Sequence, residues 1–328
     1  TNMRKLFLLL FILFLPFEVI NLLYKNAEYN FGDNDISRFK NVPYNIQIAN
    51  SGNSLGEQMD YSNHPELNAF KFSLLMQPIN CDFHILEQYI DHFEKNSVFI
   101  IVLSYGEVDG ILSDEVYKVI KGRYYQFLKS NYIEEYSFFD KIRYCAIPVV
   151  YAEYPFYKIK RNFLKYEEPE ETQEKSPQKK CFLEKRLEQD SFMNIFNTTY
   201  PRQKQAGIEY NKQYVLNMVH LCNEHNIHPV VVTPPLPANT VDILKKTDYF
   251  DAFENLKKSI IAECNACQLE VNWLDFNRSE EYIHHAEWFK DPVHLKDEYS
   301  AEYTDKIIHA IKEMGFLQPL NQENKNAF

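Results

Sequence analysis

A serine between two glycines lies in the segment Gly52-Asn-Ser54-Leu-Gly56. The segment follows an apolar stretch typical of a strand and precedes an expected helix. A serine on a tight strand-to-helix turn is exposed at the carboxyl end of a sheet, and the free N–H groups of the following helix can stabilise a developing oxyanion. The pattern indicates a nucleophilic serine, and an ordinary glycine-containing turn is the alternative interpretation.

A carboxylate and an imidazole stand three residues apart in Asp291-Pro-Val-His294, shortly before the last expected helix. On one turn of chain these two side chains can point into the same pocket. The imidazole of His294 would act as general base on the hydroxyl of Ser54. Asp291 would hold the ring tautomer and stabilise the imidazolium. The sequence therefore predicts a serine–histidine–aspartate site, provided that the fold brings the two segments together.

Apolar runs and helical spacings alternate along the chain, which predicts an α/β domain with a parallel sheet covered on both faces. The expected strands are 45–50, 98–104, 228–234 and 269–275, and the expected helices between and after them are 82–95, 207–225, 250–267 and 300–314. The carboxyl ends of parallel strands lie at one edge of the sheet. Ser54 follows the first of these strands, so the nucleophile is expected at that edge.

Residues 109 to about 205 interrupt this alternation. A helix is expected at 114–130, and a charged run at 166–190 is typical of a solvated surface loop. The stretch is interpreted as an insertion into one domain that spans residues 45–318. Near an active site such an insertion would act as a lid or as a wall that shapes the substrate pocket. Residues 319–328 form the expected C-terminal tail.

The first 24 residues have the pattern of a signal peptide or signal anchor. A basic pair, Arg4-Lys5, precedes the apolar segment 6–24, which only Glu18 interrupts with a charge. No small-residue cleavage site follows, which favours a retained anchor over a cleaved signal. The basic end should stay in the cytoplasm, so the polar stalk at 25–44 and the domain behind it are expected to be extracytoplasmic.

Composition argues against several classes of function. The net charge is −11, from 46 acidic and 35 basic residues, and this field repels the phosphates of nucleic acids. The adjacent histidines His284 and His285 point in different directions in regular structure, and Cys264 and Cys267 have no second pair. There is no phosphate-binding glycine motif. No metal or other cofactor is therefore expected.

A nucleophilic serine behind the first core strand, with acid and base together near the C-terminus, distinguishes this chain from the α/β-hydrolases, in which several strands precede the serine. The layout resembles the SGNH (GDSL-type) hydrolases. Segments 45–56, 80–105 and 289–295 are similar to the first, middle and last conserved blocks of a membrane-anchored bacterial group of that class. The resemblance implies a flavodoxin-like three-layer α/β/α sandwich and the hydrolysis or transfer of O-acyl esters.

The family's oxyanion hole also uses a glycine of a second block and an asparagine of a third. Here Leu75-Met-Gln77 and Ser104-Tyr-Gly106 stand at those places. The side chains of Gln77 and Ser104 are the candidate substitutes. Together with them, the oxyanion or substrate-binding residues implied by the resemblance are Gly52, Leu55 and Tyr105.

The sequence thus predicts a serine esterase or O-acyltransferase that acts on acyl esters of an extracellular glycan. The bacterial group is linked to surface polysaccharides and cell-wall acyl groups, so the resemblance implies a glycan or acyl ester as substrate and a membrane-bound acyltransferase as a partner. The missing glycine and asparagine support an alternative of another class. This alternative is a non-catalytic protein that binds a glycan or a partner in the cleft of the same fold.

Overall fold

The computed structural model describes residues 2–29, 36–111, 114–146, 203 and 205–317. Most of the predicted insertion, including its charged run, and the C-terminal tail lie outside the described residues. The chain divides into two compact units. One comprises Thr1–Asn41 with Tyr117–Lys179, and the other comprises Val42–Val116 with Lys180–Phe328.

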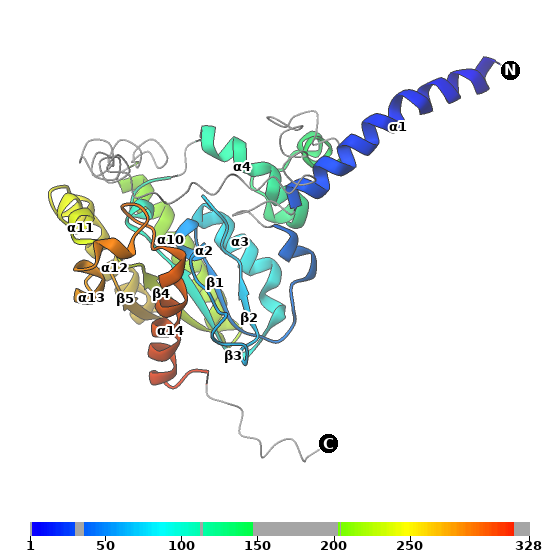
Figure 1. Cartoon of the computed structure of the whole chain (residues 1–328). Helices are drawn as coiled ribbons and strands as arrows, with labels where there is room; N and C mark the ends of the chain where they lie inside the picture. The colour runs from blue at the N-terminus through cyan, green and yellow to red at the C-terminus, as the bar shows by residue number, and fades with distance from the viewer. Residues whose placement is uncertain (1, 30–35, 112–113, 147–202, 204, 318–328) are drawn as a thin grey trace, which may run out of the picture. The chain divides into compact units, whose positions relative to one another are not determined.

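The larger unit contains a five-stranded sheet in which every strand pairs in parallel (Figure 1). The strands are β1 (Ile46–Ser51), β2 (Ala69–Lys71), β3 (Phe93–Val102), β4 (His228–Thr233) and β5 (Asn272–Asp275). Their order is β2-β1-β3-β4-β5, which is the doubly wound, flavodoxin-like order. In that order the chain leaves β1 and β3 in opposite directions across the sheet, so the carboxyl end of β1 lies at the topological switch point.

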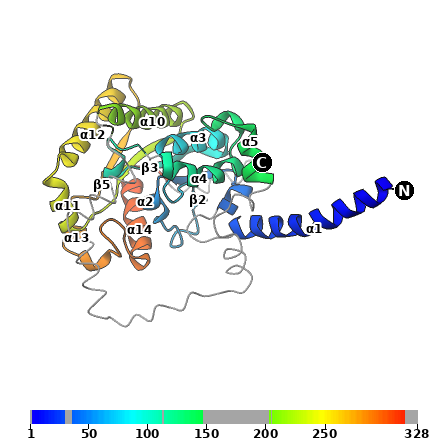
Figure 2. The same ribbon diagram turned by 90° about the horizontal axis from the view of Figure 1, so that it is seen from above.

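Helices cover both faces of this sheet, which confirms the predicted three-layer α/β/α sandwich. The helices are α3 (Ile79–Tyr89), α10 (Gln205–Glu224), α11 (Ala238–Lys245), α12 (Tyr249–Ala266), α13 (Glu280–Ile283) and α14 (Asp297–Glu313). Figure 2 shows α3, α10 and α12 on one side of the sheet and α14 on the other.

Both faces of the sheet are apolar because β3 and β4 carry apolar side chains at successive positions. Every second residue of β3 and β4, such as Val98, Ile100 and Val230, packs with Tyr303 and Ile307 of α14. The residues between them are also fully buried and point to the opposite face, because successive side chains of a strand alternate. Burying one valine or isoleucine completely contributes about 1.5–3 kcal/mol, so these continuous apolar runs hold the sheet between its two helical layers.

The expected boundary between the helix at 82–95 and the strand at 98–104 was wrong. The helix expected at 82–95 ends at Tyr89 as α3, and residues 93–95 already belong to β3. A short 3₁₀ turn, Ile90–His92, separates the two elements. The edge strand β2 was not predicted, because it has three half-buried residues and therefore shows neither an apolar run nor a clear alternation.

The smaller unit contains α1 (Asn2–Tyr29), the 3₁₀ helix η2 (Ile36–Asn41), most of α4 (Asp114–Phe127), α5 (Phe138–Lys141) and the π-helix η6 (Ile142–Ala146). The apolar segment 6–24 lies within α1. The side-chain amide of Asn21 donates to the carbonyl of Ala146, and the rings of Phe39 and Phe127 stack with centroids 4.0 Å apart. No helix in the described part of the chain has both the length and the apolar character of a membrane span.

Candidate active site

Ser54 is the first residue of α2 (Ser54–Glu57), a single helical turn that follows β1. Asn53 caps this turn: its Oδ1 accepts a hydrogen bond from the N–H of Leu55 at 3.0 Å, and its carbonyl accepts from the N–H of Gly56 at 2.9 Å. A capping asparagine is well suited to this place, because its short side chain satisfies a helix N–H that has no carbonyl partner. The cap fixes the backbone that presents Ser54.

Steric contacts explain why both residues that flank this turn, Gly52 and Gly56, are glycines. Gly52 adopts φ +119°, a backbone conformation that residues with a side chain rarely adopt. A Cβ at this position would also lie 2.9 Å from the Cβ of Val102. A Cβ on Gly56 would lie 2.6 Å from the carbonyl oxygen of Ser51. Residues 52–57 are called the nucleophile turn here, after the role predicted for Ser54. Because its two glycines lack side chains, this turn can pack against β3 and against the end of β1.

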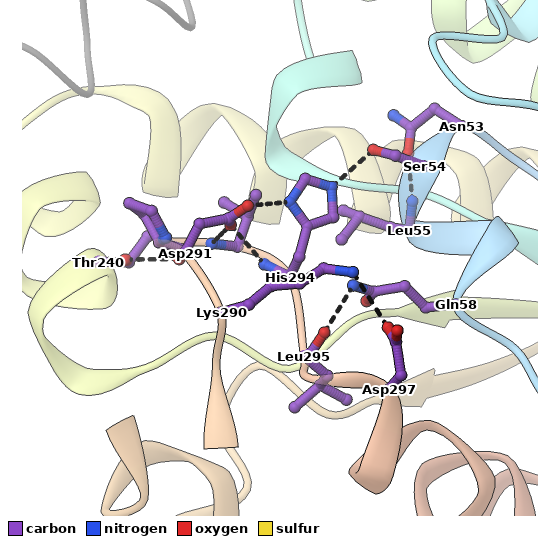
Figure 3. A network of polar contacts seen from close by, with 12 residues as sticks. Asn53, Ser54, Leu55, Gln58, Thr240, Lys290, Asp291, His294, Leu295 and Asp297 are labelled. Carbon is purple, nitrogen blue, oxygen red and sulfur yellow. Dashed lines mark hydrogen bonds and ion pairs between the residues drawn. The ribbon is translucent and has the colours of Figure 1, made fainter. Parts of the chain in front are cut away.

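Ser54, His294 and Asp291 form a continuous hydrogen-bonded chain (Figure 3). The Oγ of Ser54 lies 2.8 Å from Nε2 of His294, and Nδ1 of the same ring lies 2.7 Å from Oδ2 of Asp291. The side chains of His294 and Asp291 are 23% and 27% exposed. The structure thus brings together two segments 240 residues apart, and both side chains remain partly exposed.

Asp291 is fixed on its other side by the backbone. Its Oδ1 accepts hydrogen bonds from the N–H groups of Val293 and His294, both at 2.9 Å. Burial raises the pKa of this carboxyl, but the hydrogen bond and charge of His294, with the two backbone N–H groups, outweigh burial and lower it. Asp291 is therefore ionised at neutral pH and holds the proton of the ring on Nδ1. This tautomer leaves Nε2 free to accept the proton of Ser54.

Two further contacts hold the loop that carries His294. The hydroxyl of Thr240 donates to the carbonyl of Pro292 at 2.7 Å, and the amide of Gln58 donates to the carbonyl of Leu295 at 3.2 Å. Gln58 is the residue that ends α2, so the nucleophile turn and the histidine loop are joined by a second hydrogen bond besides the one between Ser54 and His294.

Gln77, one of the two side chains predicted to replace the missing oxyanion donors, makes hydrogen bonds within the protein instead. Gln77 is buried, and its side-chain N–H₂ donates to the carbonyl of Phe72 and to Oδ1 of Asp82. That same Oδ1 accepts from the N–H of Gly52 at 2.8 Å. With both amide hydrogens engaged, Gln77 supports the nucleophile turn through Asp82 and does not present a donor to an oxyanion in this geometry.

The side chain of Ser104 is also hydrogen-bonded within the protein, whereas Tyr105 is buried and its hydroxyl has no hydrogen-bond partner among the described residues. The N–H and the hydroxyl of Ser104 both donate to Oε2 of Glu107 at 3.0 Å. Tyr105 is buried, and its ring packs against Phe253 with the centroids 4.5 Å apart. The N–H of Leu55 is taken by Asn53, so among the candidate donors of the turn only the backbone N–H of Ser54 has no hydrogen bond within the described residues.

The turn where a glycine was expected has a glycine-like backbone. Met76 adopts φ +56°, a left-handed conformation that costs a residue other than glycine on the order of 1 kcal/mol. The segment runs beside the nucleophile turn, because the N–H of Leu74 donates to the carbonyl of Gly52 at 3.2 Å. This glycine-like backbone could not be predicted from the sequence, because a methionine does not indicate a positive φ.

The sequence prediction did not include Asn53 and Asp82, the polar residues that hold the nucleophile turn, or Glu107, which accepts from Ser104. Asp82 contacts the turn across 30 positions of sequence, and Glu107 comes from the loop after β3. The sequence did contain a signal for both acidic residues. Glu107 follows soon after an apolar strand, and Asp82 lies in the first turn of α3. No group of three or more histidine, cysteine or acidic side chains in the described ranges is arranged to hold a metal ion.

Glu107 gives the stability of this domain a predictable pH dependence. Its burial raises the pKa of its carboxyl from 4.5 to about 7, despite the hydrogen bonds from Ser104 and Asn53. Between these two values the folded chain retains a proton that the unfolded chain has lost. The free energy of unfolding should therefore fall as the pH rises from about 4.5 to about 7, by about 3 kcal/mol in total for this group.

Glu107→Gln should flatten this slope, because glutamine does not titrate. Urea denaturation of both chains between pH 4.5 and 8 measures the effect. Glu209→Gln on the exposed face of α10 is the matched control and should keep the wild-type slope. Equal slopes in all three chains would contradict the elevated pKa of Glu107.

No protein-family model matches this chain, and no curated protein matches it.

Proposed function

We propose that this chain is a serine esterase or O-acyltransferase that acts on acyl esters of an extracellular glycan. The observation that carries the proposal is the hydrogen-bonded sequence from the hydroxyl of Ser54 through the ring of His294 to the carboxylate of Asp291. A serine hydroxyl is a weak nucleophile by itself, and a base within 2.6–3.2 Å that is oriented by a third group is the arrangement that activates it.

The reaction would proceed in two steps. Oγ of Ser54 attacks the ester carbonyl while Nε2 of His294 takes its proton, and Asp291 stabilises the imidazolium. The N–H of Ser54, which has no hydrogen bond among the described residues, would stabilise the oxyanion. His294 then returns the proton to the departing alcohol, which leaves an acyl group on Ser54. Transfer of this group to water makes the protein an esterase, and transfer to a sugar hydroxyl makes it an acyltransferase.

The proposed substrate class and location rest on the charge of the chain and on the family resemblance. Neutral sugars suit a chain of net charge −11 better than phosphate polymers do. The proposed location is extracytoplasmic, with residues 6–24 as a membrane anchor, and a membrane-bound acyltransferase is the proposed partner that would supply acyl groups. The resemblance to the membrane-anchored SGNH-like group supports each of these points.

The test is covalent labelling of the purified chain with a fluorophosphonate, together with hydrolysis of an aryl acetate. We expect one label per chain, located on Ser54 by peptide mapping, and slow release of acetate that a sugar acceptor accelerates if the chain is a transferase. A chain that takes no label and releases no acetate would contradict the catalytic proposal.

A non-catalytic glycan-binding protein on the same fold is the alternative, and one observation favours it. The side chains of Gln77 and Ser104 and the N–H of Leu55 are all hydrogen-bonded internally. Loss of one oxyanion donor typically costs on the order of 10²–10³ in rate. Binding of O-acylated glycans by a chain that resists labelling would establish this alternative.

A further inference from the structure

Asn50 is a fully buried polar residue near the end of β1. Its side-chain amide donates to the carbonyl of Gly56 at 2.9 Å. Its longer contacts, to the hydroxyl of Ser73 at 3.3 Å and to the carbonyl of Ser51 at 3.4 Å, are weaker. The bond from Asn50 to Gly56 joins the strand before the nucleophile turn to the far side of that turn. One carboxamide therefore closes the loop that carries Ser54.

The carboxamide of Asn50 is oriented from its other end by Tyr61. The hydroxyl of Tyr61 donates to Oδ1 of Asn50 at 3.1 Å. A carboxamide rotated by half a turn would place Oδ1 against the carbonyl of Gly56, where two acceptors would face each other. Tyr61 and Gly56 thus favour the same orientation, in which the N–H₂ group of Asn50 points to the turn.

The backbone of the turn packs closely on the residues around Asn50. A Cβ on Gly56 would lie 2.9 Å from the Cβ of Ser73, so there is no room for a side chain between the turn and the segment after β2. The carbonyl of Gly56 also accepts from the N–H of Met59 at 3.2 Å. That bond comes from the chain that continues the turn, whereas the bond from Asn50 comes from the sheet.

We propose that Asn50 is a positioning residue that holds α2 against the end of β1, so that Ser54 stays aligned with His294. Asn53 and Asp82 hold the first part of the turn, and Asn50 holds its last part. The catalytic meaning of this proposal rests on the proposed function. The geometry does not, because the bond to Gly56 exists whether or not Ser54 reacts.

Replacing Asn50 with aspartate tests this role. Asn50→Asp keeps the shape of the side chain, but an ionised carboxylate has no hydrogen to donate to Gly56. We expect the rate constant for fluorophosphonate labelling of Ser54 to fall about 10- to 100-fold at pH 8, the usual effect of misplacing a reacting group by up to 1 Å. Asn223→Asp is the matched control, because the amide of Asn223 also donates to two backbone carbonyls. It precedes β4 at the opposite edge of the sheet and should label at the wild-type rate.

The pH dependence of labelling separates a lost hydrogen bond from a general loss of structure. A protonated carboxyl can donate to the carbonyl of Gly56, and burial raises the pKa of a carboxyl introduced at this position. The labelling rate of Asn50→Asp relative to the wild type should therefore recover to within about threefold at about pH 5.5, whereas slowing by protonation of His294 affects both chains and cancels. Tyr61, the titratable group bonded to this side chain, keeps its proton because burial raises its pKa. A reduced ratio that stays constant between pH 5.5 and 9 would contradict the proposal.

Amide hydrogen exchange of the peptide that contains residues 54–57 provides a readout that needs no catalysis. The N–H groups of Gly56 and Glu57 donate to the carbonyl of Asn53 at 2.9 and 3.1 Å. These bonds should open more often once Asn50 no longer holds the turn. Exchange at pH 8 should therefore be faster in Asn50→Asp and unchanged in Asn223→Asp. Wild-type exchange in a folded Asn50→Asp chain would overturn the proposal.

A wild-type chain that takes no label would contradict the proposed function, and the exchange data alone would then decide the role of Asn50. If Asn50→Asp does not fold, Tyr61→Phe is the milder variant, because it removes only the donor that orients the carboxamide. It should accelerate exchange of the same peptide and slow labelling about 3- to 10-fold, as expected for one hydrogen bond. Unchanged exchange in Tyr61→Phe would then overturn the proposal.

Discussion

Replacing Ser54 with alanine should abolish covalent labelling by a fluorophosphonate and reduce ester hydrolysis by roughly 10⁴- to 10⁶-fold, as expected when the nucleophile of a serine triad is lost. The hydroxyl of Ser54 makes its hydrogen bond to His294, whereas the turn itself is held by Asn53 and Asp82. The variant should therefore fold with a melting temperature close to that of the wild type. Labelling is measured by intact-mass spectrometry, and hydrolysis is measured by release of an aryl alcohol.

Ser62→Ala is the matched control, because Ser62 is an exposed serine in the loop that follows α2. It should label and hydrolyse at the wild-type rate. A Ser54→Ala chain that still takes one label would remove Ser54 from the chemistry. A chain that loses both labelling and its cooperative unfolding would show only that the turn had collapsed, and Ser54→Cys, which keeps a hydrogen-bonding group, would then decide between the two.

The hydrogen-bonded arrangement of Ser54, His294 and Asp291 could be predicted from the sequence mainly because of the sheet topology. In a parallel sheet every strand ends at the same edge, so a serine directly after the first core strand and a histidine directly before the last helix converge there without any knowledge of their distance. The local spacing of Asp291 and His294 adds the rest, since one carboxylate can bridge to the ring and to two backbone N–H groups of its own turn.

The supporting residues could not be found in this way. Gln77 was predicted to be a free donor, because the sequence does not show that its amide donates to Asp82. The same carboxylate accepts from the N–H of Gly52. Ser104 likewise bonds to Glu107, three residues further on. Such contacts depend on how the loops after β2 and β3 fold over the sheet edge. Local periodicity fixes the strands but leaves the paths of these loops open.

Changing Asp291 to asparagine should lower the rate of ester hydrolysis about 10⁴-fold while leaving the fold intact. The asparagine oxygen can still accept from the N–H groups of Val293 and His294, so the loop keeps its turn. Its N–H₂, however, faces Nδ1 of the ring and donates to it. The proton of His294 then moves to Nε2, which donates to Ser54 and can no longer accept its proton.

Asp297→Asn is the matched control, because Asp297 is an exposed aspartate six residues further along that pairs with Lys290. A surface ion pair contributes about 0–1 kcal/mol, so this variant should retain nearly all activity. The ¹⁵N shifts of the His294 ring show which nitrogen carries the proton, and they should report Nδ1–H in the wild type and Nε2–H in Asp291→Asn. Full activity with a changed tautomer would exclude His294 as the base. A large loss of activity with an unchanged tautomer would mean that the negative charge of Asp291 matters more than its control of the ring proton.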